Sequence, residues 1–373
     1  MTAEKTHEAI EKAILTQLSP PSGSNFSKSW IQSVRKLSNH YVAEPESISP
    51  WREPWAQEAL LSYYHPLNQA RAQRVAQQGL SVGFFDGIEH IIDIGCGSGA
   101  GSLGFLIDLP VGQIKSLELS DHSEAVTQIA KKLVASSGVA PAKVTTSHQS
   151  IDFYKSSVVE PGTMLVLSYV LTESHSEKTL RNLLMRLSGL EAIAILEPST
   201  SQDARRLQAL RPLLLEMGFT IWAPCTHHGA CPLLKDSDRD WCHDRLTPHL
   251  PPWWESLEAG LPMKNRTVTV SYLLARRNLR VIPLATEVRV IGDRLDEKTK
   301  VRQMICRHDQ REFISWFPSR LKGEAENFEL SRGDRFQTDE SIWKDPRGID
   351  RSKEYRLDLT AIYSIGTKLK TSR

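Results

Sequence analysis

The sequence predicts an α/β protein built on a parallel sheet, and three observations support this fold class. From His90 onward, short runs rich in β-branched residues alternate with stretches of helical periodicity, which indicates repeated strand, helix, strand units with right-handed crossovers. A turn rich in glycine follows the first of these runs. The chain has 373 residues, of which 40% are hydrophobic and 24% charged, so it can form two or three globular domains.

The sequence pattern of the N-terminal part predicts helices. Apolar residues recur there at helical spacing, and two Pro-rich segments, residues 19–24 and 45–54, interrupt the pattern. The predicted helical stretches are residues 9–18, 30–37 and 56–78. We therefore predict a helical N-terminal region over residues 1–80, in which no catalytic chemistry is visible.

The sequence pattern in the middle of the chain predicts the sheet domain, over residues 81–280. Its strand-like runs are residues 91–94, 114–119, 143–148, 163–170, 192–198 and 268–275, and its helical patterns are residues 123–136, 176–187 and 203–217. A stretch rich in Pro, His and Cys separates the last two strand-like runs. We interpret residues 223–254 as a metal-binding insertion in this domain.

Residues 281–373 predict a small β-rich module, since alternating runs occur there without a long helix. The module is also the basic part of a chain whose net charge is only +2: from Arg276 to Arg373 there are 22 Lys and Arg against 16 Asp and Glu. Such an excess can attract a phosphate backbone, but a basic surface facing only water is equally compatible with it. We predict a supporting contact with RNA phosphates.

The chain has no apolar run of the roughly 18 residues that a membrane-spanning helix needs. Its first 18 residues mix charges into the apolar positions, unlike a secretory signal or a transit peptide. We therefore expect a cytoplasmic monomer with no membrane partner. The five Cys are too few for a disulfide-stabilised fold, and in a reducing compartment a cluster of Cys indicates metal binding or catalysis.

The glycine-rich turn, IIDIGCGSGAGS, points to a nucleoside-containing cofactor. Gly95, Gly97 and Gly99 let the backbone turn sharply and approach a ligand, which suits either a dinucleotide or S-adenosylmethionine. Asp93 stands just before the glycines, and Glu118, at the expected end of the next strand, can accept both ribose hydroxyls. This combination favours S-adenosylmethionine, while a dinucleotide and a purely structural turn remain alternatives. Cys96 we interpret as a packing residue.

Four further thiols, Cys225, Cys231, Cys242 and Cys306, could close one metal site. Structural zinc sites usually pair their Cys two to four residues apart, which is not the case here. Iron–sulfur clusters take four thiolates at more varied spacing. Zinc with mixed ligands stays open, because His residues that could substitute lie nearby, namely His227, His228, His243 and His308. Unligated buried cysteines are the remaining alternative.

Several stretches together resemble a known family, the small-ribosomal-subunit methyltransferase-like assembly factors found in mitochondria and bacteria. The resemblance runs over about 250 residues, and its most specific part is the ordered set of four Cys. The stretches are YYHPLNQAR, the glycine turn, LVLSYVLTE, ILEPSTSQDARRLQALRPLL, APCTHHGACP, DWCH, SYLLARR, RVIG and CRHD. It implies a class I S-adenosylmethionine-dependent methyltransferase fold, a [4Fe–4S] cluster on the four matching Cys, and action on the small ribosomal subunit and its rRNA during assembly.

The catalytic residues are less well defined. Ser168, Tyr169 and Glu173 follow the fourth strand of the predicted sheet and are candidates for contact with the methyl acceptor. Their segment is not the Asp/Asn-Pro-Pro-aromatic signature of methyltransferases that act on exocyclic base amines. Three functions therefore remain: an rRNA methyltransferase, a catalytically silent iron–sulfur assembly factor, and a zinc-binding version of that factor.

Overall fold

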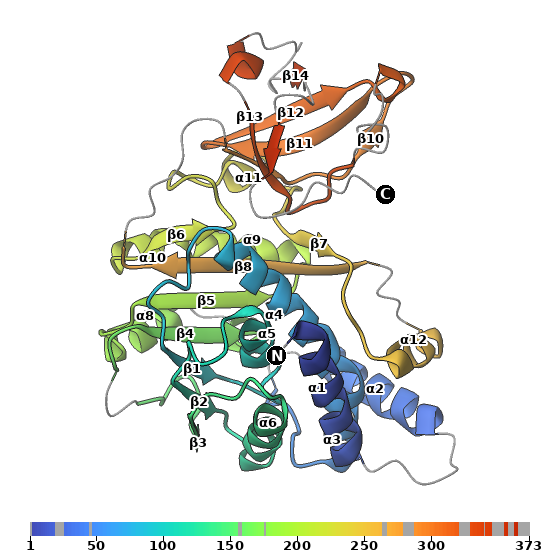
Figure 1. Ribbon diagram of the computed structural model, residues 1–373, viewed down its shortest axis with the longest axis vertical. Coiled ribbons are helices and arrows are strands. Elements are labelled where there is room, and N and C mark those ends of the chain that lie inside the picture. The colour runs from blue at the N-terminus through green and yellow to red at the C-terminus, as the bar shows by residue number, and fades with distance from the viewer. Residues whose placement is uncertain are drawn as a thin grey trace. The chain divides into compact units, whose positions relative to one another are not determined.

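The computed structural model describes most of the chain, and Figure 1 shows its elements. The described residues are 2–18, 26–44, 47–155, 159–174, 177–262, 267–278, 287–320, 329–338, 340–344, 354–356 and 362–364. They fall into two compact units. The first unit comprises residues 1–77, 85–197 and 246–268, and the second comprises residues 78–84, 198–245 and 269–373. The division into regions 1–80, 81–280 and 281–373 stays a prediction.

Helices form the N-terminal part of the first unit. They are α1 (Ala3–Leu18), α2 (Phe26–Ala43), α3 (Pro54–Ala59), the π-helix η1 (Leu60–Tyr64) and α4 (His65–Leu80). A separate helix, α12 (Pro252–Ala259), packs on α2 and η1, where the rings of Tyr63 and Trp254 stack with centroids 5.2 Å apart. The expected helix over residues 56–78 is thus interrupted by a π-helical turn that carries buried Tyr63.

A parallel sheet forms the centre of the first unit. Its strands are β1 (His90–Ile94), β2 (Ser116–Ser120), β3 (Lys143–Ser147), β4 (Thr163–Ser168) and β5 (Ala192–Glu197). They are ordered β3-β2-β1-β4-β5 and all four pairings are parallel. The intervening helices are α5 (Ala100–Asp108), α6 (Glu124–Ser136), α7 (Leu171–Ser174) and α8 (Glu177–Arg186). β4 and β5 are almost wholly buried, as strands covered on both faces must be.

The second unit begins with two helices where the sequence predicted one over residues 203–217. These are α9 (Ser201–Ala209) and α10 (Arg211–Glu216), and Pro212 lies in the first turn of α10. Proline lacks the N–H that a continuous helix needs and prefers a helix start. The next elements are β6 (Thr220–Ala223), α11 (Pro232–Lys235), β7 (Asp244–Leu246) and β8 (Val268–Arg276). β6 and β8 pair antiparallel.

A second, largely antiparallel sheet completes this unit. Its strands are β9 (Glu287–Val290), β10 (Leu295–Asp296), β11 (Val301–Arg307), β12 (Gln310–Trp316), β13 (Arg335–Thr338), β14 (Glu354–Arg356) and β15 (Ile362–Ser364), with 3-10 turns η2 (Pro318–Arg320) and η4 (Glu340–Lys344). The central strands run in the order β14-β12-β11-β9-β13-β15. Val288, Ile305, Ile314 and Phe336 are fully buried in its core.

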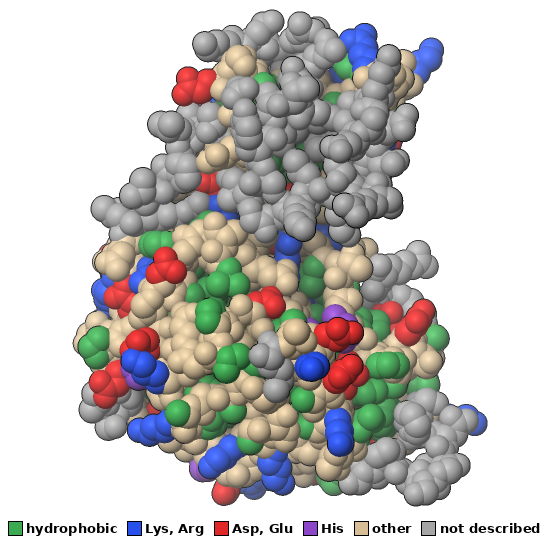
Figure 2. All heavy atoms as spheres, viewed as in Figure 1, with side chains coloured by type: hydrophobic (Ala, Val, Ile, Leu, Met, Phe, Trp, Pro, Cys, Tyr) green, Lys and Arg blue, Asp and Glu red, His purple; other side chains and the backbone are tan. Residues whose placement is uncertain are grey.

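These observations confirm the predicted fold class, an α/β protein with a parallel central sheet, N-terminal helices and β-rich C-terminal residues. The Cys-rich metal-binding insertion stays a prediction. No helix within the described ranges is long and apolar enough to cross a membrane. On the face shown in Figure 2, acidic and basic side chains are interspersed over the described surface. That face therefore gives no support to a phosphate-binding patch of one sign.

Candidate cofactor and metal sites

The glycine turn joins β1 to α5 and has the geometry of a ligand cradle. Gly95, Gly97 and Gly99 all have left-handed backbones, with φ of 68°, 50° and 78°. A Cβ at Gly97 would meet no atom within 4 Å, whereas one at Gly95 would lie 2.5 Å from Val170 Cγ2. Gly95 is therefore needed for internal packing, while Gly97 exposes its backbone to open space into which a ligand can approach.

Asp93 is the last residue but one of β1, separated from Gly95 by Ile94, and is fully buried. Its Oδ2 accepts a hydrogen bond of 2.5 Å from the Ser102 hydroxyl, and its Oδ1 has no partner among the residues described. Burial raises the pKa of Asp93 to about 7. The carboxyl is thus held beneath the turn, where its protonation state changes near neutral pH.

The predicted ribose ligand, Glu118, is the third residue of β2 and not its last. It is half-buried and accepts a hydrogen bond of 2.9 Å from the Ser147 hydroxyl on β3. The residue that follows the strand is Asp121, which is buried and accepts a hydrogen bond of 3.0 Å from the backbone N–H of Gly97. Of these two carboxylates, Asp121 is the one bonded to the backbone of the glycine turn.

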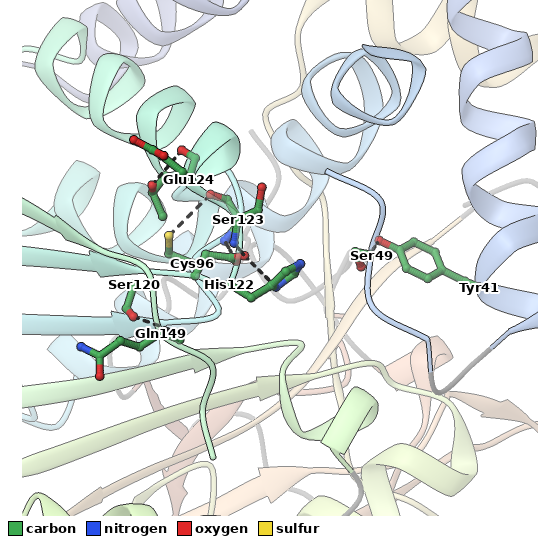
Figure 3. Close-up of polar contacts among 11 residues, drawn as sticks. Tyr41, Ser49, Cys96, Ser120, His122, Ser123, Glu124 and Gln149 are labelled. Carbon is green, nitrogen blue, oxygen red and sulfur yellow. Dashed lines mark hydrogen bonds and ion pairs between the residues drawn. The ribbon is translucent and has the colours of Figure 1, made fainter. Parts of the chain in front are cut away.

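The sequence alone did not indicate Asp121 as a site residue, because its surroundings, Ser-Asp-His-Ser, are typical of a helix start. The structure shows both roles, since Asp121 Oδ1 also accepts from the N–H of Ser123 at 3.1 Å and from His122 Nδ1 at 2.9 Å. Figure 3 shows His122 and Ser123 beside Cys96 of the turn. Burial raises the pKa of Cys96 well above its usual value, which agrees with a packing residue and not a nucleophile.

A buried histidine also contacts the turn. His65, the first residue of α4, is fully buried, and its Nδ1 lies 2.8 Å from the Ser98 hydroxyl. Its Nε2 lies 3.1 Å from Gln69 Oε1 one turn further along the helix. Burial lowers the pKa of His65 to about 4, so the imidazole is neutral at physiological pH. It fixes Ser98 without adding charge to the turn. The preceding tyrosines and the His-Pro pair were the only sequence signal for it.

The three catalytic candidates lie after β4. Ser168 is the last residue of β4 and lies against α5. A Cβ added at Gly101 of α5 would be 3.1 Å from the Cβ of Ser168. Tyr169 has a left-handed backbone with φ of 63°. Glu173 falls in α7, but its side chain lies outside what the structure describes. Ser168 and Tyr169 are thus beside the glycine turn, and the position of Glu173's carboxylate stays a prediction.

The second candidate site is formed by the four thiols, all of which belong to the second unit. Cys225 follows β6, Cys231 precedes α11, Cys242 precedes β7, and Cys306 lies on β11. Cys225, Cys242 and Cys306 are buried, and Cys231 is half-buried. Desolvation raises the pKa of Cys306 well above its usual value, and repulsion from the other three thiolates raises it further. Cys306 on the second sheet lies in one buried cluster with Cys242, and Cys231 packs against it. That all four thiols hold one metal stays a prediction.

A buried arginine faces this set of thiols. Arg211, at the start of α10, donates hydrogen bonds to the carbonyls of His227 at 3.3 Å and Gly229 at 2.7 Å. Desolvation lowers its pKa, but attraction to the four thiolates outweighs this and raises the pKa overall. The thiols with raised pKa are neutral at pH 7. Arg211 therefore attracts them only when they are ionised to thiolates. Metal binding requires that ionised form.

Donor chemistry and geometry distinguish the possible metals. A zinc ion needs four ligands about 2.3 Å from one point, and within the described ranges no group of three or more His, Cys, Asp or Glu is arranged to hold one ion. A [4Fe–4S] cluster binds each of four thiolates to a different iron, so its sulfur atoms stand further apart. Which metal the four thiols would hold therefore stays a prediction. His227 Nε2 lies 3.6 Å from Cys306 Sγ.

The comparison with protein families identifies the region that holds both candidate sites. Residues 85–316 match the family described as mitochondrial small ribosomal subunit Rsm22, which is more than half of the 373 residues. The chain belongs to the Rsm22 family. The matched region contains every candidate residue of the glycine turn and all four thiols. The Rsm22 match confirms the family resemblance seen in the sequence. Among curated proteins no match is found.

Several solved structures similar to this Rsm22 family member are described as methyltransferases. One is the magnesium protoporphyrin IX methyltransferase of Synechocystis PCC 6803 with bound S-adenosylmethionine, at 11% identity and a TM-score of 0.36, covering 66% of this chain and 97% of that one. Another is the 16S rRNA methylase RmtB, at 15% identity and a TM-score of 0.30, covering 72% and 98%. A third is the M. capricolum TrmK complex with S-adenosylhomocysteine, at 10% identity and a TM-score of 0.32, covering 55% of this chain and 69% of that one. At these values the likeness adds nothing to the Rsm22 assignment.

Proposed function

We propose that this chain is an S-adenosylmethionine-dependent methyltransferase that acts on the rRNA of the small ribosomal subunit during its assembly, and that it carries a [4Fe–4S] cluster. The observation that carries the proposal is the glycine turn, with left-handed Gly97 open on its Cβ side, inside the region that matches the Rsm22 family. The printed description of that family supports the small ribosomal subunit as the partner.

On this proposal the chain's own residues align and shield the reactants. S-adenosylmethionine supplies an electrophilic methyl group on a sulfonium, and in-line transfer then depends mainly on positioning. Gly95, Gly97 and Gly99 would approach the methionine part, Asp93 would hold the turn from beneath, and Glu118 would accept the ribose hydroxyls. Ser168 and Tyr169 would line the acceptor side.

The four thiolates would hold the cluster and stabilise the second unit. Residues 224–243 contain only one short helix, α11, and are otherwise irregular. A cluster bound to Cys225, Cys231, Cys242 and Cys306 would add to the folding free energy of this segment. Arg211 would offset the negative charge of the liganded thiolates.

Gly97→Ala tests cofactor binding. A methyl group there clashes with no protein atom but would occupy the space proposed for the cofactor. Gly112→Ala is the matched control, because Gly112 has φ of 84°, also has no atom within 4 Å of a Cβ, and lies in the connection between α5 and β2. Both variants lose about 1 kcal/mol of stability from the left-handed backbone. Isothermal titration with S-adenosylhomocysteine should show weaker binding only for Gly97→Ala, and equal affinities would contradict the proposal.

A second candidate function keeps the fold without methylation. It is favoured by the segment Ser168-Tyr169-Val170-Leu171, which lacks the signature of base-amine methyltransferases. An assembly factor of this kind needs the cluster and not the cofactor. Asp93→Ala and Glu118→Ala would then leave subunit assembly intact in cells, whereas Cys231→Ser would abolish it. Loss of assembly in all three variants would favour the enzyme.

A further inference from the structure

A chain of buried polar side chains connects helix α1 to the glycine turn. Ser98 of the turn places its hydroxyl oxygen 2.8 Å from His65 Nδ1, and Nε2 of the same ring lies 3.1 Å from Gln69 Oε1. Gln69 Nε2 in turn lies 3.4 Å from Nδ1 of His7, on α1. The exposed fractions of these four residues run from 0% for His65 to 6% for His7. The turn is therefore connected to a helix that lies outside it.

Beyond His7 the chain of side chains ends on a carboxylate. His7 hydrogen-bonds the side chain of Gln73, and Gln73 Nε2 donates to Asp108 Oδ1 at 3.1 Å. Asp108 is the last residue of α5, the helix that follows the glycine turn. All of these residues belong to the first unit. A carboxylate only accepts hydrogen bonds, so Asp108 fixes the direction of the link beside it.

This direction passes from one side chain to the next. Because Gln73 gives its N–H to the carboxylate, its oxygen is left to accept from His7. Nδ1 of His7 stands opposite the amide nitrogen of Gln69, so the ring accepts there and carries its proton on Nε2. The Gln69 oxygen then accepts from His65 Nε2–H, and His65 Nδ1 accepts from the Ser98 hydroxyl. Turning one ring or amide alone would place two donors or two acceptors face to face.

We propose that Asp108 and His7 are positioning residues for the cofactor, because they set the direction in which the Ser98 hydroxyl points within the glycine turn. This role rests on the proposed function, in which the turn binds S-adenosylmethionine. In the direction that Asp108 imposes, Ser98 donates to His65 and its proton has a buried acceptor. The turn is thereby anchored to α4 through a side chain of its own.

His7 is the link at which the direction can be reversed. A protonated His7 has an N–H on both ring nitrogens, so Gln69 must turn its oxygen toward Nδ1 and its N–H toward His65. His65 then accepts at Nε2 and carries its own proton on Nδ1, so the Ser98 hydroxyl loses its buried acceptor. Burial lowers the pKa of His7 from its ordinary value of 6.5. The ring is therefore neutral at pH 7, and reversal belongs to acidic pH.

Several elements place charged groups near His7. His249, in the segment before α12, stacks on His7 with ring centroids 4.3 Å apart, and its Nε2 lies 3.1 Å from Glu11 Oε1. A charge on His249 opposes protonation of His7, and the Asp108 carboxylate favours it. Histidine ordinarily changes charge between pH 5 and 8, so His249 must be followed together with His7. Of the other helices that contact α1, η1 carries Tyr63 and Tyr64, α4 carries Arg71 and Arg74, and α6 carries Glu124, Lys131 and Lys132.

NMR of the histidine ring nitrogens tests the direction without any ligand. Long-range proton–nitrogen correlations of the full chain, labelled with nitrogen-15 in histidine, show which ring nitrogen carries the proton. At neutral pH we expect His7 and His65 to be protonated on Nε2 alone. As His7 gains its second proton, His65 should move its proton to Nδ1. Asp108→Asn, whose amide can also donate, should let both rings populate both tautomers.

Glu8→Gln is the matched control, because it removes a carboxylate next to His7 on the exposed face of α1. It should leave both rings as they are in the wild type. The proposal is overturned if His65 carries its proton on Nδ1 at neutral pH, if His65 keeps its tautomer while His7 titrates, or if His7 is still neutral at about pH 5.

Titration with S-adenosylhomocysteine extends the test to the cofactor. The affinity of the wild type should fall roughly tenfold as His7 is protonated, the equivalent of about one lost hydrogen bond. His7→Asn keeps an acceptor oxygen but cannot gain the proton, so its affinity should lack this fall, and so should that of Ser98→Ala. Asp93 is present in all three proteins, so their difference isolates the contribution of His7.

The outcomes separate the two proposals. If S-adenosylhomocysteine binds with the same pH dependence to the wild type and to His7→Asn, the positioning role is wrong and the proposed function stands. If the wild type binds no S-adenosylhomocysteine at any pH, the proposed function is wrong and the positioning role falls with it. The expected tautomers together with a pH dependence that His7→Asn abolishes support both.

Discussion

Asp93 is buried beneath the glycine turn, and its protonation links stability to pH. Its pKa in the folded chain, raised to about 7 by burial, exceeds the ordinary value of about 3.9. The folded state therefore binds this proton more tightly than the unfolded state. The resulting stabilisation is complete below about pH 4 and is lost as the pH rises through about 7.

We predict that Asp93→Asn removes this pH dependence. The gap in unfolding free energy between variant and wild type should change in favour of the variant by an amount on the order of 2–4 kcal/mol between pH 4 and pH 8. Urea unfolding of both proteins at several pH values measures it. A gap that stays constant across this range would show that Asp93 keeps its ordinary pKa in the folded chain.

Single residues also show what sequence reasoning can reach. The four thiols were predicted to converge because their number and chemistry suffice for a site. Arg211, Asp121 and His65 could not be predicted in the same way. Each acts through a contact made only in the folded chain. Arg211, for example, donates to the carbonyl of Gly229, and the local sequence does not reveal that contact.

At the scale of elements, the close approach of α4 and α5 depends on Gly104. A Cβ at this position would lie 2.5 Å from the Ala72 Cβ, 2.5 Å from the Gln69 carbonyl oxygen and 2.8 Å from the Gln73 nitrogen. Two of these three atoms belong to the backbone of α4 and cannot rotate away. The contact also sets the position of the helix that carries His65 and Gln69, and through them the hydrogen bond to Ser98.

We predict that Gly104→Ala destabilises the first unit by about 1–3 kcal/mol through overpacking, even though alanine favours a helix by about 1 kcal/mol. It should also weaken S-adenosylhomocysteine binding, because the turn moves with α4. Adding Ala72→Gly should not restore stability, since the Gln69 carbonyl remains at the same distance. Thermal unfolding and titration of the single and double variants measure both effects, and full rescue by Ala72→Gly would refute this account.

The elements that sequence patterns predicted well are the buried strands. β4 and β5 are apolar on both faces, so their runs are unmistakable. The pattern failed where apolar spacing continued through a break. Leu207, Leu210, Leu213 and Leu214 keep helical spacing across the gap between α9 and α10, yet Pro212 starts a new helix there. Periodicity detects a buried face and does not detect a missing N–H.

At the scale of the whole molecule, the two candidate sites belong to different compact units. On the proposed function, each ligand should stabilise its own unit. S-adenosylhomocysteine at about one hundred times its Kd should stabilise the first unit by about 2.7 kcal/mol. Removing iron with a chelator under reducing conditions should destabilise the second unit, because all four thiols that would bind the cluster belong to it.

Differential scanning calorimetry of the full chain, prepared without oxygen, checks this expectation. Two transitions should appear, one moved upward by S-adenosylhomocysteine and the other moved downward by loss of the cluster. Cys231→Ser should lower the second transition and leave the first in place. If either ligand moves both transitions equally, the chain unfolds as one cooperative body and the separate assignment is wrong.

The location of Cys306 on β11 has a consequence for biosynthesis. Three thiols emerge from the ribosome within eighteen residues of each other, but the fourth is made more than sixty residues later, in a strand that must pair with β9 and β12 before it is fixed. A nascent or truncated chain therefore offers an incomplete ligand set. On the proposed function, a cluster could therefore be inserted only after most of the polypeptide has been translated, and its insertion would show that translation had passed Cys306.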